Sequence, residues 1–375
     1  MRRPPSDLGP FLRLARTEGV GPVGYRRLLQ RFGSPGEALA ALPGLARAAG
    51  RRSVHLPSLG EIEDEIAATT RLGGCFLMPH MAGYPPLLAH IADPPPVLAV
   101  LGDPGLLLGR AAGIVGSRNA SANGRHIAAD FAAGLASAGI AIVSGMARGI
   151  DAAAHEAALQ TAGGVTVAAV AGGLDRPYPA HHAELQARIA ERGAVVTEAP
   201  LGTEPQARHF PRRNRVIAGL SLGIVVIEAA RQSGSLITAR LALESGREVF
   251  AVPGSPLDPR TQGSNDLIRQ GAPLVESAAE VLALLPQDIT DFLLNTGTTP
   301  GASAFREEPA ASPQAVAEAR HALLPLLSFA PTSVDDLLRH CQFTERAALV
   351  AALLELELGG LIESLPGNRV ALLAA

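Results

Sequence analysis

The sequence predicts an α/β protein whose central part is a doubly wound, mostly parallel sheet. From about residue 97, short runs of Val, Ile and Ala alternate with amphipathic stretches of helical period. The runs are apolar throughout, which is typical of parallel strands covered by helices on both faces. The Pro-rich connections at 85–86 and 94–96 separate this part from a helical segment before it. With 375 residues, the chain is long enough for two or three domains.

The elements of the central part follow in order along the chain. The predicted strands are 97–101, 113–116, 140–144, 165–170, 194–197, 223–227, 249–252 and 273–275. The predicted helices between them include 127–138, 183–192, 236–245 and 278–285. A sheet of this kind binds ligands at the carboxyl ends of its strands, where the strand order reverses.

The first segment predicts a small helical domain. Apolar residues at helical spacing lie on both sides of a glycine-rich turn at 19–24. Two short helices joined by such a turn are similar to a helix-hairpin-helix, whose turn amides can hold a DNA phosphate. A helical domain that only packs against its neighbours is the alternative.

The last segment predicts a linker at 286–317 and a winged-helix-like domain at 318–375. The linker is rich in Pro, Thr, Ser, Ala and Gly. Helices at 318–328, 333–341 and 344–358, followed by a hairpin around Pro366-Gly367-Asn368, have the order of a winged helix. Residues 286–375 carry 5 Arg against 11 acidic side chains, which favours protein contact over DNA contact. The two remaining predicted domains are a helical domain at 1–80 and the sheet core at 81–285.

Composition excludes several classes of enzyme and site. All 32 basic side chains other than His are Arg, so no lysine is available for a P-loop or a Schiff base. The two cysteines and the histidines have no metal-ligand spacing, so we expect reduced thiols, no metal and no cofactor. Arg13 and Arg16 interrupt any signal-peptide core, and the longest uncharged run, 157–174, is broken by glycines. We therefore expect a cytoplasmic protein that does not contact a membrane.

Three predicted turns at strand ends are rich in Gly, Ser and Thr, with Arg beside two of them. Their residues are Gly116, Ser117 and Arg118; Ser144, Gly145, Arg148 and Gly149; and Ser233, Gly234, Ser235 and Thr238. Small residues let a phosphate approach backbone amides at a helix start, and Arg adds a forked donor. An ordinary capped turn is the alternative at each place. Asp151 is expected to cap its helix and His155 to pack or bond to Asp151, so neither is assigned to catalysis.

The segment Arg208 to Arg215 has the strongest local pattern. It holds four arginines in eight positions, together with Phe210, Pro211 and Asn214: the arginines are Arg208, Arg212, Arg213 and Arg215. Pro211 suits the first turn of a helix. Several arginines around an aromatic ring are typical of a site that binds the backbone and stacks the bases of single-stranded nucleic acid, although a solvated basic face is the alternative.

These patterns assign roles to individual side chains and amides. We expect phosphates to be neutralised by Arg118, Arg148, Arg212, Arg213 and Arg215. The amides of Gly116, Gly145 and Gly234 would cradle phosphates, and Phe210 would stack a base. We also expect Arg212 and Arg215 to project from the helix start and to play no part in the core.

The tract from about 85 to 285 resembles the DNA-processing protein A family. Its motifs recur in order: GSR at 116–118, SGMARGIDAAAH at 144–155, HFPRRNRVIAGLS at 209–221, EAARQSGSLITA at 228–239 and FAVPG at 250–254. The resemblance implies an extended Rossmann core between a sterile-alpha-motif-type helical domain and a winged-helix-like domain. It also implies a non-enzymatic homodimer that binds single-stranded DNA without reading sequence and loads the RecA recombinase during natural transformation. Lysines common among that family's DNA contacts are absent here.

An enzyme is the alternative hypothesis. Nucleotide N-glycoside hydrolases of the lysine-decarboxylase-like kind use a similar Rossmann core. Their sequences carry a motif that resembles PGGxGTxxE. Here the corresponding stretch, Ser233 to Arg240, contains no Glu, and Glu228 is the nearest carboxylate before it.

Overall fold

The computed structural model describes residues 8–48, 54–295, 311–341, 346–365 and 367–373. By its contacts the chain divides into two compact units. One, the terminal unit, joins residues 1–67 with 302–375, and the other, the sheet unit, comprises 68–301. The predicted domain boundaries remain predictions, although each unit can be described by itself.

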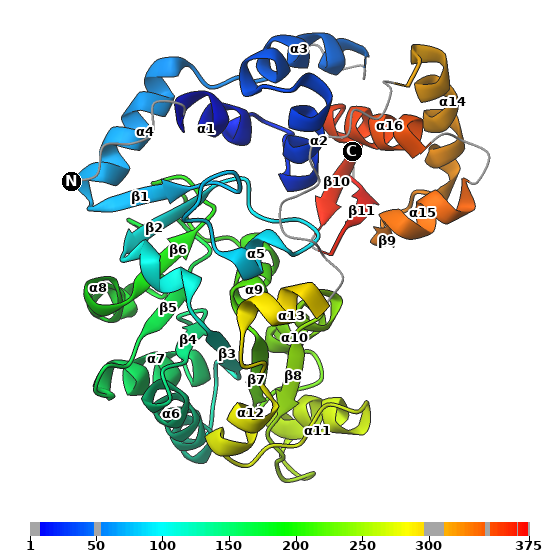
Figure 1. The fold of residues 1–375 in the computed structure, drawn as a ribbon. Helices are drawn as coiled ribbons and strands as arrows, with labels where there is room; N and C mark the ends of the chain where they lie inside the picture. The colour runs from blue at the N-terminus through cyan, green and yellow to red at the C-terminus, as the bar shows by residue number, and fades with distance from the viewer. Residues whose placement is uncertain (1–7, 49–53, 296–310, 342–345, 366, 374–375) are drawn as a thin grey trace. The chain divides into compact units, whose positions relative to one another are not determined.

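The sheet unit is built on one eight-stranded sheet (Figure 1). Its strands are β1 (Gly74–Leu77), β2 (Leu98–Gly102), β3 (Ala111–Gly116), β4 (Ala141–Ser144), β5 (Thr166–Ala169), β6 (Ala194–Thr197), β7 (Gly223–Ile227) and β8 (Glu248–Ala251). They lie in the order β1-β2-β6-β5-β4-β3-β7-β8. From β6 to β8 every pairing is parallel, while β1–β2 and β2–β6 are antiparallel.

The strand order reverses between β3 and β7. From β3 the chain adds β4, β5 and β6 on one side, then crosses to β7 and β8 on the other. Such a switch point opens a crevice at the carboxyl ends of the two central strands. The turns after β3, β4 and β7 therefore share one edge of the sheet, as the doubly wound fold predicted.

Helices cover both faces of the sheet because neighbouring strand residues point to opposite sides. In β3, Ile114 packs in one apolar core and Val115 in the other, and Val225 and Val226 of β7 divide in the same way. One core includes α6 (Ala122–Ser137), α7 (Ile150–Gln160), α12 (Ala278–Leu284) and α13 (Ile289–Asn295). The other includes α9 (His209–Leu220) and α10 (Gly234–Glu244), with α5 (Pro86–Ala89) and α11 (Gln262–Arg269) beside them. Helix α8 (Ala183–Arg192) contacts β2, β5 and β6.

Two expectations for this unit were wrong. Residues 273–275 form only a single bridge between Leu274 and Ala251, and the sheet gains instead the edge strand β1, which was not expected. Residues 289–295, expected in the linker, form α13, whose Leu293 is buried in the core. Residues 296–310 of the expected linker lie outside the described residues.

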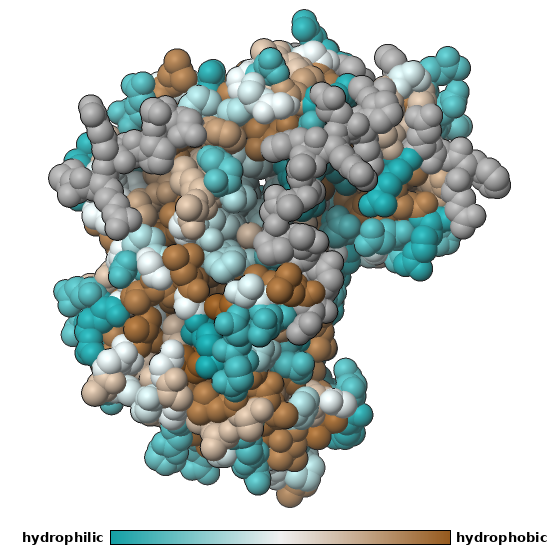
Figure 2. Space-filling model, viewed as in Figure 1, coloured by the Kyte–Doolittle hydropathy of each residue, from teal (hydrophilic) through white to brown (hydrophobic). Residues whose placement is uncertain are grey.

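Apolar residues also reach the surface, as they do in most proteins. On the face drawn in Figure 2, hydrophobic residues are interspersed with hydrophilic ones over the sheet unit. No described helix has the length and apolar character of a membrane span.

The terminal unit combines both ends of the chain. Its N-terminal helices are α1 (Leu8–Arg16), α2 (Pro22–Phe32) and α3 (Pro35–Ala48), together with α4 (Leu59–Arg71) as far as residue 67. The C-terminal part contains α14 (Pro313–Leu323), β9 (Thr332–Ser333), α15 (Val334–His340), α16 (Arg346–Leu358), β10 (Ile362–Leu365) and β11 (Arg369–Leu372). Three helices and a sheet of order β10-β11-β9 confirm the winged-helix prediction.

Candidate nucleic-acid interface

Four exposed arginines lie at the carboxyl edge of the sheet, in the turns after β3 and β4 and at the start of α9. Arg208 and Arg212 flank Phe210 on this helix, and Arg118 follows β3. Arg148 follows β4 in a loop held against the β3 turn, because the Ile150 amide donates to the Ser117 carbonyl at 3.2 Å. Within the described part of the chain, none of these four guanidinium groups forms an ion pair. We call Arg118, Arg148, Arg208, Arg212 and Phe210 the arginine surface.

Phe210 forms the centre of the arginine surface. The guanidinium carbon of Arg118 lies 4.9 Å from the centre of its ring, and that of Arg213 lies 5.6 Å from it. Tyr178 meets the ring edge-on, with the ring centres 5.6 Å apart. Since Arg213 is buried and Arg118 is exposed, we infer that Arg118 covers the outward face of the ring. The expectation that Phe210 itself stacks a base therefore changes, because a base would meet the guanidinium plane of Arg118 first.

Arg213 and Asn214 do not face solvent, contrary to expectation. Arg213 donates to the carbonyls of Gly145 and Ala169, the latter at 3.1 Å, and so ties the ends of β4 and β5 to α9. Asn214 accepts from Arg213 at 3.1 Å and donates to the Gly234 carbonyl at 3.3 Å. Burial lowers the pKa of Arg213 to about 10, and the charge of Asp151 opposes that shift. These side chains hold the turns in place and cannot reach a phosphate.

Arg215 is also part of the interior, so its expected phosphate contact and its expected freedom from the core were both wrong. Its side chain is 3% exposed, and it pairs with Glu198 and with Asp93, whose carboxylate lies 3.4 Å away. Burial opposes the charge of Arg215, but the two carboxylates outweigh it and raise its pKa. Residues three apart share a face of a helix, so helical position alone does not separate exposed Arg212 from buried Arg215. The loops that carry Asp93 and Glu198 cover Arg215.

The turn after β4 uses its polar groups internally. The Ser144 hydroxyl donates to the Ile114 carbonyl at 2.6 Å, and the buried Gly145 amide donates to Asp151 at 3.2 Å. A Cβ at Gly145 would collide with Arg213. Gly149 has φ +81°, and a Cβ there would collide with the Ser117 carbonyl. These glycines serve close packing, so the Gly145 amide is not free to cradle a phosphate.

The other predicted turn residues divide between surface and interior. Gly116 ends β3, and a Cβ there would collide with the Ile227 carbonyl, while Ser117 accepts from the Asn119 amide at 3.1 Å. Ser233 caps α10 and shares a 2.6 Å hydrogen bond with the buried Ser235. Thr238 is buried, whereas Gly234 is exposed with open space around it. Ser117, Ser233 and Gly234 remain accessible from this edge of the sheet.

His155 and Asp151 have structural roles. The Thr166 hydroxyl donates to the Ile142 carbonyl, so His155 Nδ1, 2.7 Å from that hydroxyl, must be the donor between them. Burial lowers the pKa of His155 to about 3. His155 packs in the interior, which is one of its two expected outcomes, and does not bond to Asp151. Asp151 accepts from the amides of Gly145 and Ala147 in the preceding turn, and it does not cap the helix as expected. Burial raises the pKa of Asp151, with Arg213 opposing.

Comparison with known proteins identifies the family. A model described as "DNA recombination-mediator protein A" matches residues 75–286, which is more than half of the chain. The chain belongs to the DNA recombination-mediator protein A family. Further models of this family match at each end: a DprA-like N-terminal HHH domain at 7–68 and a DprA winged-helix domain at 307–368.

Individual members of the DNA recombination-mediator protein A family support this membership. Protein Smf of Escherichia coli K12 is 43% identical over 265 residues, which cover 69% of this chain and 67% of that protein. Protein Smf of Synechocystis is 32% identical over 399 residues, covering 97% of this chain and 98% of that protein. The X-ray structure of DNA processing protein A from Streptococcus pneumoniae superposes with a TM-score of 0.64 and 34% identity, covering 76% of this chain and all of that one.

The helix-hairpin-helix turn of this family member is covered from within its own unit. The carboxylate of Glu357, on α16, lies at the start of α2, where a Cβ on Gly21 would be 2.8 Å from Glu357 Oε1. Leu354 and Leu358 of the same helix pack with Tyr25 and other N-terminal apolar residues. The turn that was considered for DNA phosphate therefore faces a carboxylate.

Sequence reasoning did not assign two features, one at the arginine surface and one in the interior behind it. Tyr178, 48% exposed, contacts the edge of Phe210 although 31 residues separate them, and its only signal was aromatic character in a chain with three Tyr. The partners of Arg215 were also missed, because Asp93 and Glu198 come from loops distant in sequence.

Proposed function

We propose that this protein is a single-stranded DNA-binding recombination mediator without catalytic activity. In this role it protects incoming DNA during natural transformation and loads the RecA recombinase onto it. The arginine surface is the observation that carries the proposal: four exposed guanidinium groups, free of ion pairs among the described residues, lie at neighbouring turns on one edge of the sheet, and one of them, Arg118, lies over the Phe210 ring. Membership of a family described as recombination mediators supports it.

The chemistry of the surface suits a flexible strand. Exposed guanidinium groups bind phosphate oxygens in pairs and remain charged at any physiological pH. The guanidinium carbon of Arg118 lies 4.9 Å from the centre of the Phe210 ring, so that a base can stack on a guanidinium group already supported by a ring. Stacking of this kind does not depend on the identity of the base, and an unpaired strand can offer bases and phosphates together.

The number of phosphate contacts follows from burial. Arg213 and Arg215 are occupied inside the protein, which leaves Arg118, Arg148, Arg208 and Arg212. Each phosphate contact with a single strand contributes roughly −0.7 to the slope of log affinity against log salt concentration, so four contacts predict a slope of about −2.8. Five contacts that included the buried pair would have predicted about −3.5.

Binding of oligo-dT and of a duplex of equal length should be compared by fluorescence anisotropy over a series of salt concentrations. We expect tighter binding of the single strand and a slope near −2.8. The triple variant Arg118→Ala/Arg208→Ala/Arg212→Ala should reduce the slope to about −0.7. Arg240→Ala, on an exposed arginine of α10 that pairs with Glu244, is the matched control. A wild-type affinity that does not change with salt would refute the proposal.

RecA loading, a homodimeric state and a cytoplasmic location complete the proposed function. They rest on the family resemblance and not on a particular contact in this chain. Assembly of RecA on single strands already coated by a single-strand-binding protein would test the first, with the triple variant as the comparison. A rate of RecA assembly that is the same with and without the wild-type protein would exclude the loading role.

A further inference from the structure

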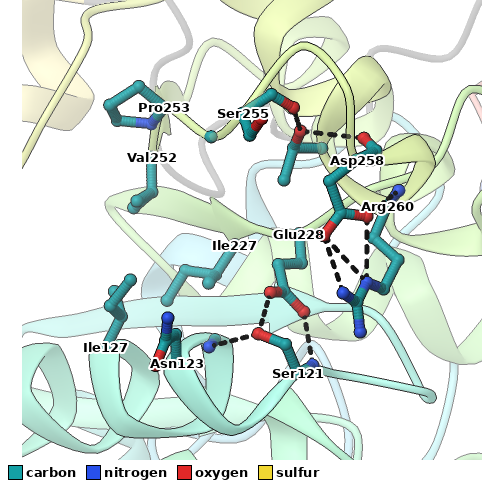
Figure 3. A pocket seen from close by; sticks show the side chains of 13 residues that line it. Ser121, Asn123, Ile127, Ile227, Glu228, Val252, Pro253, Ser255, Asp258 and Arg260 are labelled. Carbon is teal, nitrogen blue, oxygen red and sulfur yellow. Dashed lines mark hydrogen bonds and ion pairs between the residues drawn. The ribbon is translucent and has the colours of Figure 1, made fainter.

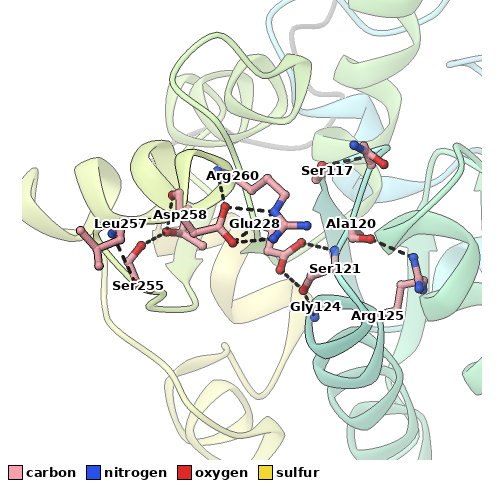
Figure 4. A network of polar contacts seen from close by, with 12 residues as sticks. Ser117, Ala120, Ser121, Gly124, Arg125, Glu228, Ser255, Leu257, Asp258 and Arg260 are labelled. Atoms are coloured by element: carbon pink, nitrogen blue, oxygen red, sulfur yellow. Dashed lines mark hydrogen bonds and ion pairs between the residues drawn. The ribbon is translucent and has the colours of Figure 1, made fainter.

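The turn between β3 and α6 is held on both sides of the exposed Arg118. Before Arg118, the Ser117 carbonyl accepts from the Ile150 amide at 3.2 Å. After it, the Ser121 amide and hydroxyl both donate to the carboxylate of Glu228, which follows β7 and lies 107 residues further along the chain (Figure 4). Arg118 is therefore carried by a short segment whose two ends are fixed by contacts that are distant in sequence.

The contact between Glu228 and Ser121 uses both oxygens of the carboxylate. Oε2 accepts from the Ser121 amide at 2.8 Å, and Oε1 accepts from the Ser121 hydroxyl. The same hydroxyl accepts from the Gly124 amide at 2.8 Å and so caps α6. A Cβ on Gly124 would be 2.6 Å from Glu228 Oε2, so a glycine is required beside the carboxylate. The carboxylate thus fills the start of α6, where negative charge is favourable, and fixes the first turn of this helix.

The backbone of Glu228 indicates that its side chain has a specific role. Its φ is +51°, in the left-handed region that few residues other than glycine adopt. Glycine or asparagine would take this conformation with less strain. Strained residues persist mainly at functional sites, where the side chain supplies something that the easier residues lack. The side chain of Glu228 supplies the connection from β7 to the turn that carries Arg118.

A cavity of about 280 Å³ beside Glu228 contains a second carboxylate, that of Asp258 (Figure 3). Asp258 belongs to the loop after β8 and binds Arg260 of the same loop through two guanidinium nitrogens. The two carboxylates line one cavity but hold different segments, since Glu228 binds the β3–α6 turn and Asp258 binds its own loop. Asp258 is therefore a matched control for Glu228.

We propose that Glu228 is a positioning residue for DNA binding, which holds the β3–α6 turn so that Arg118 stays over Phe210. This inference rests on the proposed single-strand function. The guanidinium carbon of Arg118 lies 4.9 Å from the centre of the Phe210 ring, a weak contact that depends on where the turn places the side chain. Without the Glu228 anchor the turn would gain conformational freedom, and DNA binding would have to order it again at a cost in affinity.

The direction of the effect separates positioning from simple electrostatics. A carboxylate near a DNA-binding surface repels phosphates, so loss of its charge alone should strengthen binding. Positioning predicts the opposite: Glu228→Ala should weaken oligo-dT binding, by up to about five-fold at 0.1 M salt, the loss expected for one phosphate contact. Glu228→Gln keeps an oxygen that can accept from the Ser121 amide and should recover most of the affinity. Asp258→Ala removes a charge from the same cavity and should not weaken binding.

A double-mutant cycle with Arg118→Ala, measured by oligo-dT anisotropy, shows whether Glu228 acts through Arg118. If it does, Glu228→Ala should weaken binding in the wild-type background and have no further effect in the Arg118→Ala background. A general loss of structure would weaken binding by the same factor in both backgrounds, and this result would overturn the inference. Unchanged or tighter binding by Glu228→Ala alone would overturn it as well.

Hydrogen exchange of the full chain without DNA tests the anchor separately from the proposed function. Exchange in the segment 117–121 should be faster in Glu228→Ala and unchanged in Asp258→Ala. Unchanged exchange in both variants would overturn the inference even if the wild-type chain binds oligo-dT. Failure of the wild-type chain to bind oligo-dT would instead refute the proposed function, and this role of Glu228 with it.

A second variant keeps the test available if Glu228→Ala does not fold. Ser121→Ala removes the hydroxyl bond from the other side of the contact and retains the amide bond. It should weaken oligo-dT binding in the wild-type background and leave it unchanged in the Arg118→Ala background. Equal losses in the two backgrounds, or no loss in either, would overturn the inference.

Discussion

Arg212 and Arg215 lie on the same helix, three positions apart, and should respond to substitution in opposite ways. Arg212 is exposed beside Phe210, whereas Arg215 is buried between Glu198 and Asp93. Arg212→Ala removes one phosphate contact and no internal bond. Arg215→Ala removes the partner of two carboxylates that are themselves largely shielded from water.

The size of each effect follows from this difference. Arg212→Ala removes one phosphate contact, which contributes about 0.7 to the salt exponent. Affinity for oligo-dT should therefore fall about five-fold at 0.1 M salt, and the slope of log affinity against log salt should change from about −2.8 to about −2.1. Arg215→Ala leaves buried carboxylates uncompensated, which costs about 3–5 kcal/mol. For a unit of this size the midpoint of thermal unfolding should fall by about 6–20 °C.

The assays are oligo-dT anisotropy at several salt concentrations and thermal unfolding followed by circular dichroism. For Arg212→Ala we expect weaker binding and an unchanged melting temperature. For Arg215→Ala we expect a lower melting temperature, and any protein that remains folded should keep the wild-type salt slope. If Arg215→Ala leaves the melting temperature unchanged and reduces the slope, the assignment of Arg215 to the interior is wrong.

Three further predictions concern single side chains. Phe210→Leu keeps apolar volume but removes the ring beneath Arg118, so affinity for oligo-dT should fall about five-fold or more, and an unchanged affinity would exclude ring-supported stacking. His155 has a folded-state pKa of about 3, below its unfolded value near 6.5. The neutral His155 therefore contributes to stability above pH 6.5. As the pH falls from 6.5 toward 3, the free energy of unfolding should decrease by up to about 1.4 kcal/mol per pH unit. Urea unfolding of His155→Gln should show a shallower loss over that window, and a slope identical to that of the wild type would contradict the assignment. Glu357→Ala removes the carboxylate at the start of α2 and should lower the free energy of unfolding of the terminal unit by about 1–2 kcal/mol. Urea unfolding measures this effect, and Glu363→Ala is the control. Equal effects of the two substitutions would argue against a specific role of Glu357.

The fold could be predicted because its determinants are local. The strand at 223–227 and the helix at 183–192 were predicted at their observed bounds, since apolar runs and helical periods depend on neighbouring residues alone. The edge strand β1 was missed because pairing with β2, and not its own pattern, makes it a strand. Helix α13 was missed because its surroundings in the sequence resemble a linker, while the burial of Leu293 is a tertiary contact.

By itself, the sequence determined the seven strands from β2 to β8, the edge of the sheet that carries the polar turns and the absence of lysine from any phosphate contact. Only the tertiary structure decided which arginines face solvent. Arg212 and Arg215 are the same residue type in the same motif, yet one is exposed and the other pairs with Asp93 and Glu198. A sequence states that a side chain can be charged, but whether that charge meets water, a carboxylate or a ligand depends on segments that only folding brings together.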